Sequence, residues 1–270
     1  MGERRSISNL QHEASEYISM IKNDFYVDIY DTKHLEAIKI HYFNKKIYLS
    51  ILMSVSYAAA RCRPDILKET AFLSTLTHNL TLSCWKRLFK VCGYLISNPI
   101  LDIIFSDGSL KSPAQAYTDA SFLVHRNTNG HTGIILKLYG NTVLQKSIKQ
   151  RLVTKSVMEA ELLALEEGLT YALFLGNLMQ DLGLPLKVPI QIFSDNEAAI
   201  LVAKKGRGSF KRTKHFLNKY HWIKQFIDDK TVELIHVRSE NNIADYFTKP
   251  IIGVLFWFFL ELIIRNHETN

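Results

Sequence analysis

Cysteine is scarce in this sequence, and the few cysteines follow no metal or disulfide pattern. There are three, Cys62, Cys84 and Cys92, which is an odd number, and none belongs to a C-x-x-C pair or to a cysteine–histidine cluster with zinc spacing. A zinc module and a disulfide framework are therefore not expected. The composition instead favours buried thiols in a reducing compartment.

Long hydrophobic runs, internal repeats and low-complexity tracts are also missing. The most apolar segment, 254–264, is interrupted by Glu261 and is shorter than the ~20 residues that a helix needs to cross a bilayer. Met1 is followed by polar and charged residues, not by the apolar core of a secretory signal. We therefore expect no membrane partner and a terminal helix that is buried or lies at an interface, with a membrane anchor as the alternative.

What the sequence does have is enough apolar content for a folded core and an excess of positive charge. Of its 270 residues, 47% are hydrophobic, which supports one large domain or two small ones. The 33 Lys and Arg against 26 Asp and Glu give a net charge of +7. Such a surface favours polyanions such as nucleic acid.

The hydrophobic pattern changes along the chain. From Ile47 to Leu95, apolar residues recur at helical spacing with breaks at Pro64 and at His78-Asn79, which predicts three short helices. A stretch rich in turn residues, 107–113, then marks the expected domain boundary. We therefore predict a mostly helical segment 1–112, an α/β domain 113–250 and an apolar tail 251–270.

Strand and helix patterns alternate in the second region. The expected strands are 116–120, 133–139, 143–148, 188–193 and 232–237, with a hairpin turn at Gly140-Asn141. The expected helices are 156–180, one from Asn196, 214–227 and a short one from Asn241. This order predicts an α/β fold with a mixed five-stranded sheet flanked by helices, preceded by the smaller helical region.

Four acidic residues in this region are candidates for a metal site. Asp119 lies near the end of a strand, where Asp is disfavoured except at an edge, a turn or a site. Glu161 lies among apolar residues on its helix, where an ionised carboxylate is costly unless it is paired or binds a metal. Glu159 instead completes a capping box with Ser156, which is a sufficient structural role.

The other two candidates have structural alternatives. Asp195 follows a strand, at the end where α/β sheets place their sites, but Ser194, Asp195 or Asn196 could equally cap the next helix. Asp245 could be an ordinary polar residue of a short helix capped by Asn241 or Asn242. If the four form one site, their carboxylates must converge in the folded domain.

The order of these residues resembles the ribonuclease H domain of copia-type long-terminal-repeat retrotransposon Pol polyproteins. The matching segments are Tyr117-Thr-Asp-Ala-Ser121, Met158-Glu-Ala-Glu-Leu-Leu-Ala-Leu165, Phe193-Ser-Asp-Asn196, Arg212-Thr-Lys-His215 with Tyr220-His221, and Asn242-Ile-Ala-Asp-Tyr-Phe-Thr-Lys-Pro250. This resemblance implies a ribonuclease H-like fold and a hydrolase acting on nucleic acid.

The first region is similar to the segment that connects reverse transcriptase to ribonuclease H in the same polyproteins. Its matching residues are Tyr48-Leu-Ser-Ile-Leu52, Tyr57, Ala60-Arg-Cys-Arg-Pro-Asp-Ile66, Trp85-Lys-Arg-Leu88 and Tyr94-Leu95. The resemblance implies a chain without the polymerase catalytic part, with the reverse transcriptase portion of a Pol polyprotein as a candidate partner. It also implies an intracellular location, in the cytoplasm or nucleus, or in cytoplasmic particles for an active element.

The resemblance further implies an activity and a cofactor. A metal-dependent endonuclease would hydrolyse the RNA strand of an RNA–DNA hybrid, with Asp119, Glu161, Asp195 and Asp245 holding two Mg²⁺ ions, or Mn²⁺ as the alternative ion. Asp119 is expected to bridge both ions. The products would be RNA with a 3′-hydroxyl end and an intact DNA strand.

A basic stretch without any acidic residue follows Asp195. We expect its side chains to contact the phosphates of the hybrid, with a solvated basic loop as the alternative. The candidate nucleic-acid-binding residues are Lys204, Lys205, Arg207, Lys211, Arg212 and Lys214.

Two other functions stay open on the sequence. A noncatalytic retroelement remnant could keep the fold and bind nucleic acid or a polymerase partner. An integrase of the same fold superfamily is disfavoured by the additional basic helix before the fourth acid and by the Thr248-Lys-Pro250 ending. His236 lies inside an expected strand, so we interpret it as a core or sheet-surface residue.

Overall fold

The computed structural model describes residues 45–106, 114–186, 189–205 and 214–265. The chain divides into two compact units, Met1–Leu101 and Asp102–Asn270. The predicted boundary stretch, 107–113, lies outside the described residues, so the division into three segments stays a prediction.

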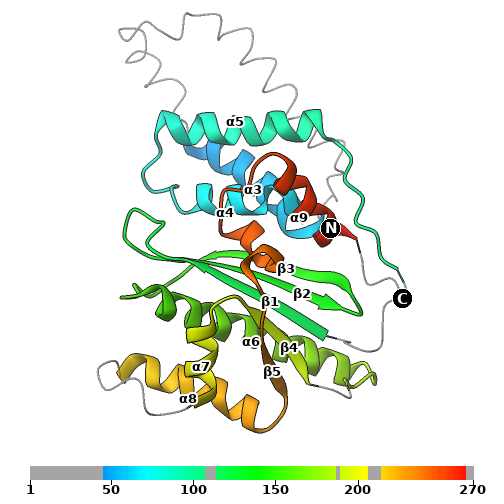
Figure 1. The fold of residues 1–270 in the computed structure, drawn as a ribbon. Helices are drawn as coiled ribbons and strands as arrows, with labels where there is room; N and C mark the ends of the chain where they lie inside the picture. The colour runs from blue at the N-terminus through cyan, green and yellow to red at the C-terminus, as the bar shows by residue number, and fades with distance from the viewer. Residues whose placement is uncertain (1–44, 107–113, 187–188, 206–213, 266–270) are drawn as a thin grey trace, which may run out of the picture. The chain divides into compact units, whose positions relative to one another are not determined.

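The described part of the first unit, residues 45–101, is mostly helical, as predicted. It contains α3 (Lys45–Arg61), the 3₁₀ turn η1 (Pro64–Ile66), α4 (Leu67–Ser74) and α5 (Leu82–Ser97) (Figure 1). The rings of Tyr48 and Trp85 meet edge to face at 5.1 Å in its core. The buried Arg63 side chain pairs with Asp65 and also donates to the Asn98 carbonyl oxygen at 2.8 Å, which joins the turn after α3 to the end of α5.

The second unit contains the predicted mixed five-stranded sheet with flanking helices, which is confirmed. Its strands are β1 (Ala114–Ser121), β2 (His131–Leu138), β3 (Asn141–Lys149), β4 (Ile190–Ser194) and β5 (Val232–His236). Their order is β3-β2-β1-β4-β5 (Figure 1). The pairs β1–β2 and β2–β3 are antiparallel, whereas β1–β4 and β4–β5 are parallel.

The hairpin between β2 and β3 is one residue earlier than predicted. Its two turn residues are Tyr139 and Gly140, both with positive φ (50° and 77°), and Asn141 already pairs with Leu138 as the first residue of β3. Two consecutive positive φ values are typical of a type I′ turn, which matches the twist of the flanking strands. Tyr139 is an unusual residue there, which explains the shifted prediction.

One face of the sheet is covered by α6 (Val157–Asp181). Side chains alternate along a strand, so the buried Ala116, Thr118 and Ala120 share the face of β1 that packs on this helix, and Asp119 lies on the opposite face. Among the described residues, α6 is the one helix long and apolar enough to cross a membrane, and half of its most apolar window is buried in the protein core.

The remaining elements follow β4 and β5. They are α7 (Glu197–Lys205), α8 (Lys214–Asp228), the 3₁₀ turns η2 (Ser239–Asn241) and η3 (Ile243–Phe247), and α9 (Val254–Ile264). The apolar tail thus contains a short helix that buries Phe259, Leu260 and Ile263 while Val254 and Trp257 stay exposed. The turn η3 packs on β1 and β2, on the face that carries Asp119.

Candidate metal centre

Asp119 is held at the carboxyl end of β1. It is 1% exposed, and its Oδ2 accepts a hydrogen bond from the Thr248 hydroxyl, which lies just after η3. The Ser121 hydroxyl in turn donates to the Thr248 carbonyl oxygen at 3.3 Å. Thr248, near the end of the domain sequence, therefore orients the Asp119 carboxylate, and Ser121 holds the backbone of Thr248 in place.

Asp195 directly follows β4, and it is not a helix cap. Asn196 caps α7, because its Oδ1 accepts from the Ala199 N–H at 2.9 Å, and the Ser194 hydroxyl accepts from the Asn196 N–H at 3.2 Å. Asp195 instead accepts a hydrogen bond from the Ser239 hydroxyl at 2.5 Å. Since β1 and β4 are parallel neighbours, Asp119 and Asp195 lie at the same edge of the sheet.

Asp245 lies in η3, and Asn242 takes the capping role there. The Asn242 side chain accepts from the Ala244 N–H at 3.3 Å and donates to the Thr118 carbonyl oxygen at 3.0 Å, which fastens η3 to β1. The Ser147 hydroxyl of β3 adds a second tie by donating to the Phe247 carbonyl oxygen at 2.8 Å. These bonds hold the buried Asp245 over the sheet.

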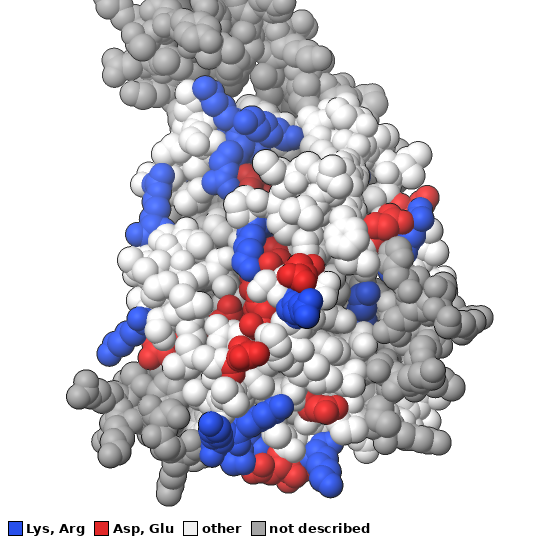
Figure 2. All heavy atoms as spheres, in the orientation of Figure 1, with Lys and Arg blue, Asp and Glu red and all other residues white. Residues whose placement is uncertain are grey.

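The structure brings three of the four predicted acids together. Carboxylate oxygens of Asp119, Asp195 and Asp245 all lie within 4.8 Å of one another. Figure 2 shows acidic side chains grouped near the centre of one face of the molecule, with lysine or arginine side chains beside them. Three carboxylates this close repel one another, so they need a cation or a proton to be stable together.

Glu161 is buried beside this cluster but outside the 4.8 Å set. It is 4% exposed, and its Oε2 has no hydrogen-bond partner among the described residues. Burial, followed by the charges of Asp119 and Asp195, raises the pKa of Glu161 well above its ordinary value. Glu159 is also buried, at 7% exposed, but it has the predicted capping role, because its Oε2 accepts from the Lys155 N–H at 2.6 Å and its own N–H donates to the Ser156 hydroxyl.

The donor set fits a hard divalent cation. All four groups offer oxygen ligands, as Mg²⁺ and Mn²⁺ prefer. Two of these oxygens, Asp245 Oδ1 and Glu161 Oε2, are buried without a hydrogen-bond partner in the part of the chain that the structure describes, which is costly unless a ligand compensates. The residues present therefore fit a divalent metal.

Three contacting residues were not predicted as part of the site. Lys249 donates to Asp245 Oδ2 at 2.7 Å and lies 3.6 Å from Asp119 Oδ1. An acid four residues before a lysine is a spacing that can pair locally, so this contact could have been read from the sequence. Thr248 and Ser239 gave no comparable signal, because their partners Asp119 and Asp195 are distant in sequence.

The basic candidates are only partly described. Lys204 and Lys205 form the exposed last turn of α7. Arg207, Lys211 and Arg212 lie outside the described residues, and so does the side chain of Lys214 at the start of α8. His236 ends β5 with its ring partly exposed, 3.8 Å from Glu197, as expected for a histidine at the sheet surface.

We predict that the metal-free protein loses stability as the pH rises through about 7. Burial, and then the charge of Asp119, raises the pKa of Asp245 from 3.8 to about 7, while Lys249 opposes this shift. The folded state therefore binds a proton more tightly than the unfolded state, so the stabilisation is full below the unfolded pKa and is lost above the folded pKa. Urea denaturation with a chelator present measures how the free energy of unfolding depends on pH across this range. The Asp245→Asn substitution should make that dependence weaker. An unchanged dependence would contradict the raised pKa of Asp245.

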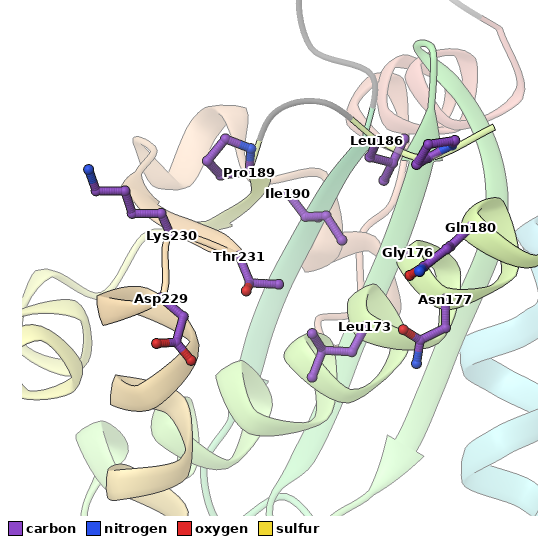
Figure 3. A pocket seen from close by; sticks show the side chains of 11 residues that line it. Leu173, Gly176, Asn177, Gln180, Leu186, Pro189, Ile190, Asp229, Lys230 and Thr231 are labelled. Carbon is purple, nitrogen blue, oxygen red and sulfur yellow. The ribbon is translucent and has the colours of Figure 1, made fainter. Parts of the chain in front are cut away.

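A separate pocket of about 340 Å³ lies at the other end of β4. Figure 3 shows Leu173 and Ile190 at its wall and Asn177, Gln180 and Asp229 around it. Ile190 begins β4, whereas Asp195 follows its last residue, so this pocket is distinct from the acidic cluster. It has a single lining carboxylate, Asp229, and does not offer a metal-ligand set.

The chain is similar to curated transposon polyproteins. It is 30% identical over 207 residues to the retrovirus-related Pol polyprotein from transposon TNT 1-94 of Nicotiana tabacum, a match covering 76% of this chain and 15% of that protein. It is 29% identical over 213 residues to the corresponding protein from transposon RE2 of Arabidopsis thaliana, covering 77% and 14%. The match to the Ty1-NL2 Gag-Pol polyprotein of Saccharomyces cerevisiae is 24% over 221 residues, covering 79% and 12%.

Solved structures show similarity at low identity. LC11-RNase H1, isolated from compost, has a TM-score of 0.39 and 18% identity, with 50% of this chain and 92% of that chain covered. The foamy viral protease-reverse transcriptase in complex with RNA/DNA hybrid has a TM-score of 0.44 and 14% identity, with 78% and 26% covered. No family model matches the chain.

The polyprotein matches extend over most of this chain but over a small part of each relative. The chain spans about a seventh of the length of the first two plant polyproteins, since 15% and 14% of them are covered. The family identified from the sequence motifs is thereby confirmed. The chain is a homologue of a segment of retrovirus-related Pol polyproteins from transposons.

Proposed function

We propose that this chain is a metal-dependent endonuclease that hydrolyses the RNA strand of RNA–DNA hybrids. The observation that carries the proposal is the convergence of Asp119, Asp195 and Asp245 within 4.8 Å, next to a buried Glu161 whose Oε2 accepts no hydrogen bond from any described residue. Separate strands and a 3₁₀ turn deliver these acids, which is the kind of arrangement that a two-metal phosphodiesterase site requires.

The four acids would hold two divalent ions, with Mg²⁺ as the proposed ion and Mn²⁺ as an alternative. When bound, such ions supply activation of the attacking water and stabilisation of the leaving 3′-oxygen. The chain itself supplies orientation: Thr248 fixes Asp119 at the end of β1, and Ser239 fixes Asp195 at the end of β4. The ties from Asn242 and Ser147 hold the turn that carries Asp245.

The nucleic acid would contact the lysines in the last turn of α7. Lys204 and Lys205 are exposed there, on the helix that follows Asp195 directly. Lysines near phosphates bind through charge and carry no sequence preference, which suits an enzyme that acts on hybrids of any sequence. The reverse transcriptase portion of a Pol polyprotein is the proposed protein partner, since the relatives are such polyproteins.

The double substitution Lys204→Ala with Lys205→Ala is expected to weaken hybrid binding and its salt dependence. Each lost phosphate contact should reduce the slope of log affinity against log salt by roughly 0.9 or somewhat less. Fluorescence anisotropy with a labelled hybrid at several salt concentrations, in Ca²⁺ to prevent cleavage, measures both effects. Lys224→Ala is the control, because Lys224 pairs with Asp228 on α8; an equal loss in that variant would mean a general charge effect.

Cleavage by the wild-type chain tests the function directly. Purified protein with Mg²⁺ should cut the RNA of an end-labelled RNA–DNA hybrid, leave 3′-hydroxyl ends and spare the DNA strand, and excess chelator should abolish cutting. Double-stranded RNA and double-stranded DNA of the same sequence serve as substrate controls. Binding of the hybrid without any cleavage would reject the nuclease and favour a noncatalytic, nucleic-acid-binding remnant.

A further inference from the structure

The acidic cluster contains a cation of the protein's own. The Lys249 ammonium lies 2.7 Å from Asp245 Oδ2 and 3.6 Å from Asp119 Oδ1, so it contacts two of the three converging carboxylates. Lys249 is four residues after Asp245 and follows Thr248, whose hydroxyl donates to Asp119. The short segment after η3 thus contacts both acids through neighbouring side chains.

We propose that Lys249 is the counter-ion of the metal-free site and that its ammonium competes with divalent cations for Asp119 and Asp245. This inference rests on the proposed metal-dependent function and adds a residue that sets metal affinity. The competition is direct at Asp245 Oδ2, because an oxygen that accepts from an ammonium at 2.7 Å has that lone pair unavailable to a metal. At Asp119 Oδ1, which lies 3.6 Å from the ammonium, Lys249 acts through its charge.

The electrostatic effect of the Lys249 charge also lowers metal affinity. A lysine charge beside a site for divalent cations repels them, and the repulsion between a single charge and a double charge a few ångströms apart weakens binding by about tenfold even in a water-like dielectric. The charged amine has its counter-charges close by, since carboxylate oxygens of Asp245 and Asp119 lie 2.7 and 3.6 Å from the Lys249 ammonium.

The Lys249 side chain is free to leave. Its side chain is 42% exposed, whereas the side chains of Asp119 and Asp245 are 1% and 12% exposed. The flexible lysine can therefore swing into solvent while the acids stay in place. Without metal, the ammonium compensates carboxylates that would otherwise be close together, buried and uncompensated.

Metal affinity of the full chain tests the proposal without using activity. Isothermal titration with Mn²⁺ should show binding about tenfold tighter for Lys249→Met than for wild type, since removal of the competing charge is worth roughly one power of ten. Lys249→Arg keeps a cation and should bind within about threefold of wild type. Lys224→Met is the matched control. It removes the ion pair between Lys224 and Asp228 on α8, which has the same length of 2.7 Å and the same separation of four residues as the pair between Lys249 and Asp245. This control should leave metal affinity unchanged.

A measurement on the wild-type chain covers the case in which Lys249→Met fails to fold. Limited acetylation followed by mass spectrometry should show that saturating Mn²⁺ increases modification of Lys249, because its ammonium leaves the acids, while Lys224 is modified equally with and without metal. Equal or weaker Mn²⁺ affinity in a folded Lys249→Met variant, or metal-independent acetylation of Lys249, would overturn the proposal.

The outcomes separate this inference from the nuclease function. If wild type binds Mn²⁺ but never cuts a hybrid, the nuclease fails while the affinity comparison still decides the role of Lys249. If hybrid is cut and Lys249→Met binds Mn²⁺ no more tightly, only the counter-ion role fails. If no variant binds Mn²⁺, the metal site and the competition are both rejected.

Discussion

Hybrid cleavage by the Asp119→Asn variant is expected to be at least ~10³-fold slower than by wild type, since bound metals contribute several kcal/mol of transition-state stabilisation and each 1.36 kcal/mol is a factor of ten. Asp119 is the central choice because it is 1% exposed and lies next to both Asp195 and Asp245. Asparagine keeps the shape of the side chain and one carbonyl oxygen that can still accept from Thr248. It removes the negative charge that two divalent ions require.

The same substitution should not destabilise the metal-free protein. Removing one of three converging carboxylates relieves their repulsion, so the melting temperature in chelator should equal or exceed that of wild type. Single-turnover cleavage of labelled hybrid and thermal melting separate the two effects. Asp229→Asn is the control, because Asp229 is exposed at the pocket beyond the opposite end of β4. Unchanged cleavage in Asp119→Asn would reject the assigned site.

Gly133→Ala is expected to lower the free energy of unfolding by about 1–3 kcal/mol, the usual cost of an added methyl group in a packed interior. Gly133 pairs with Asp119 across β1 and β2. A Cβ there would lie 2.6 Å from the Ala244 carbonyl oxygen and 2.9 Å from Thr248 Cγ2. The backbone of η3 must therefore move, and Asp245 moves with it.

This displacement predicts a loss of metal affinity together with the loss of stability. Mn²⁺ titration and urea denaturation of Gly133→Ala measure both quantities. The matched control is Gly93→Ala in α5, where an added Cβ has no atom within 4 Å and alanine should stabilise the helix by up to about 1 kcal/mol. A Gly133→Ala protein with wild-type Mn²⁺ affinity would show that the close approach of η3 does not position Asp245.

Secondary structure was largely readable because local patterns determine it. The apolar spacing of α6 and the Ser156 capping signal predicted a helix at 156–180, and the structure has it at Val157–Asp181. The hairpin was displaced by one residue because Tyr139 adopts a positive φ that its type does not favour. Pairing with β1 and β3 decides where β2 ends, and no local pattern carries that information.

The choice among Ser194, Asp195 and Asn196 shows the limit of local reasoning about the site. All three residue types are common helix caps, so the sequence did not determine which residue caps α7 and which is available for the metal site. The structure assigns the cap to Asn196 and joins Asp195 to Ser239, a residue 44 positions away. Contacts of this kind depend on the parallel pairing of β4 with β5, which local periodicity does not specify.

By itself, the sequence determined the element types, the mixed sheet, the relation to transposon polyproteins and the identity of the four candidate acids, because spacing and motif order are local properties. Only the tertiary structure decided that Asp119, Asp195 and Asp245 converge within 4.8 Å, that Glu161 is buried beside them, and that Lys249 pairs with the cluster. The physical reason is that these distances depend on how η3 packs on β1 and β2. Gly133 leaves room for η3, and hydrogen bonds from Asn242 and Thr248 join it to residues of β1 that are distant in sequence.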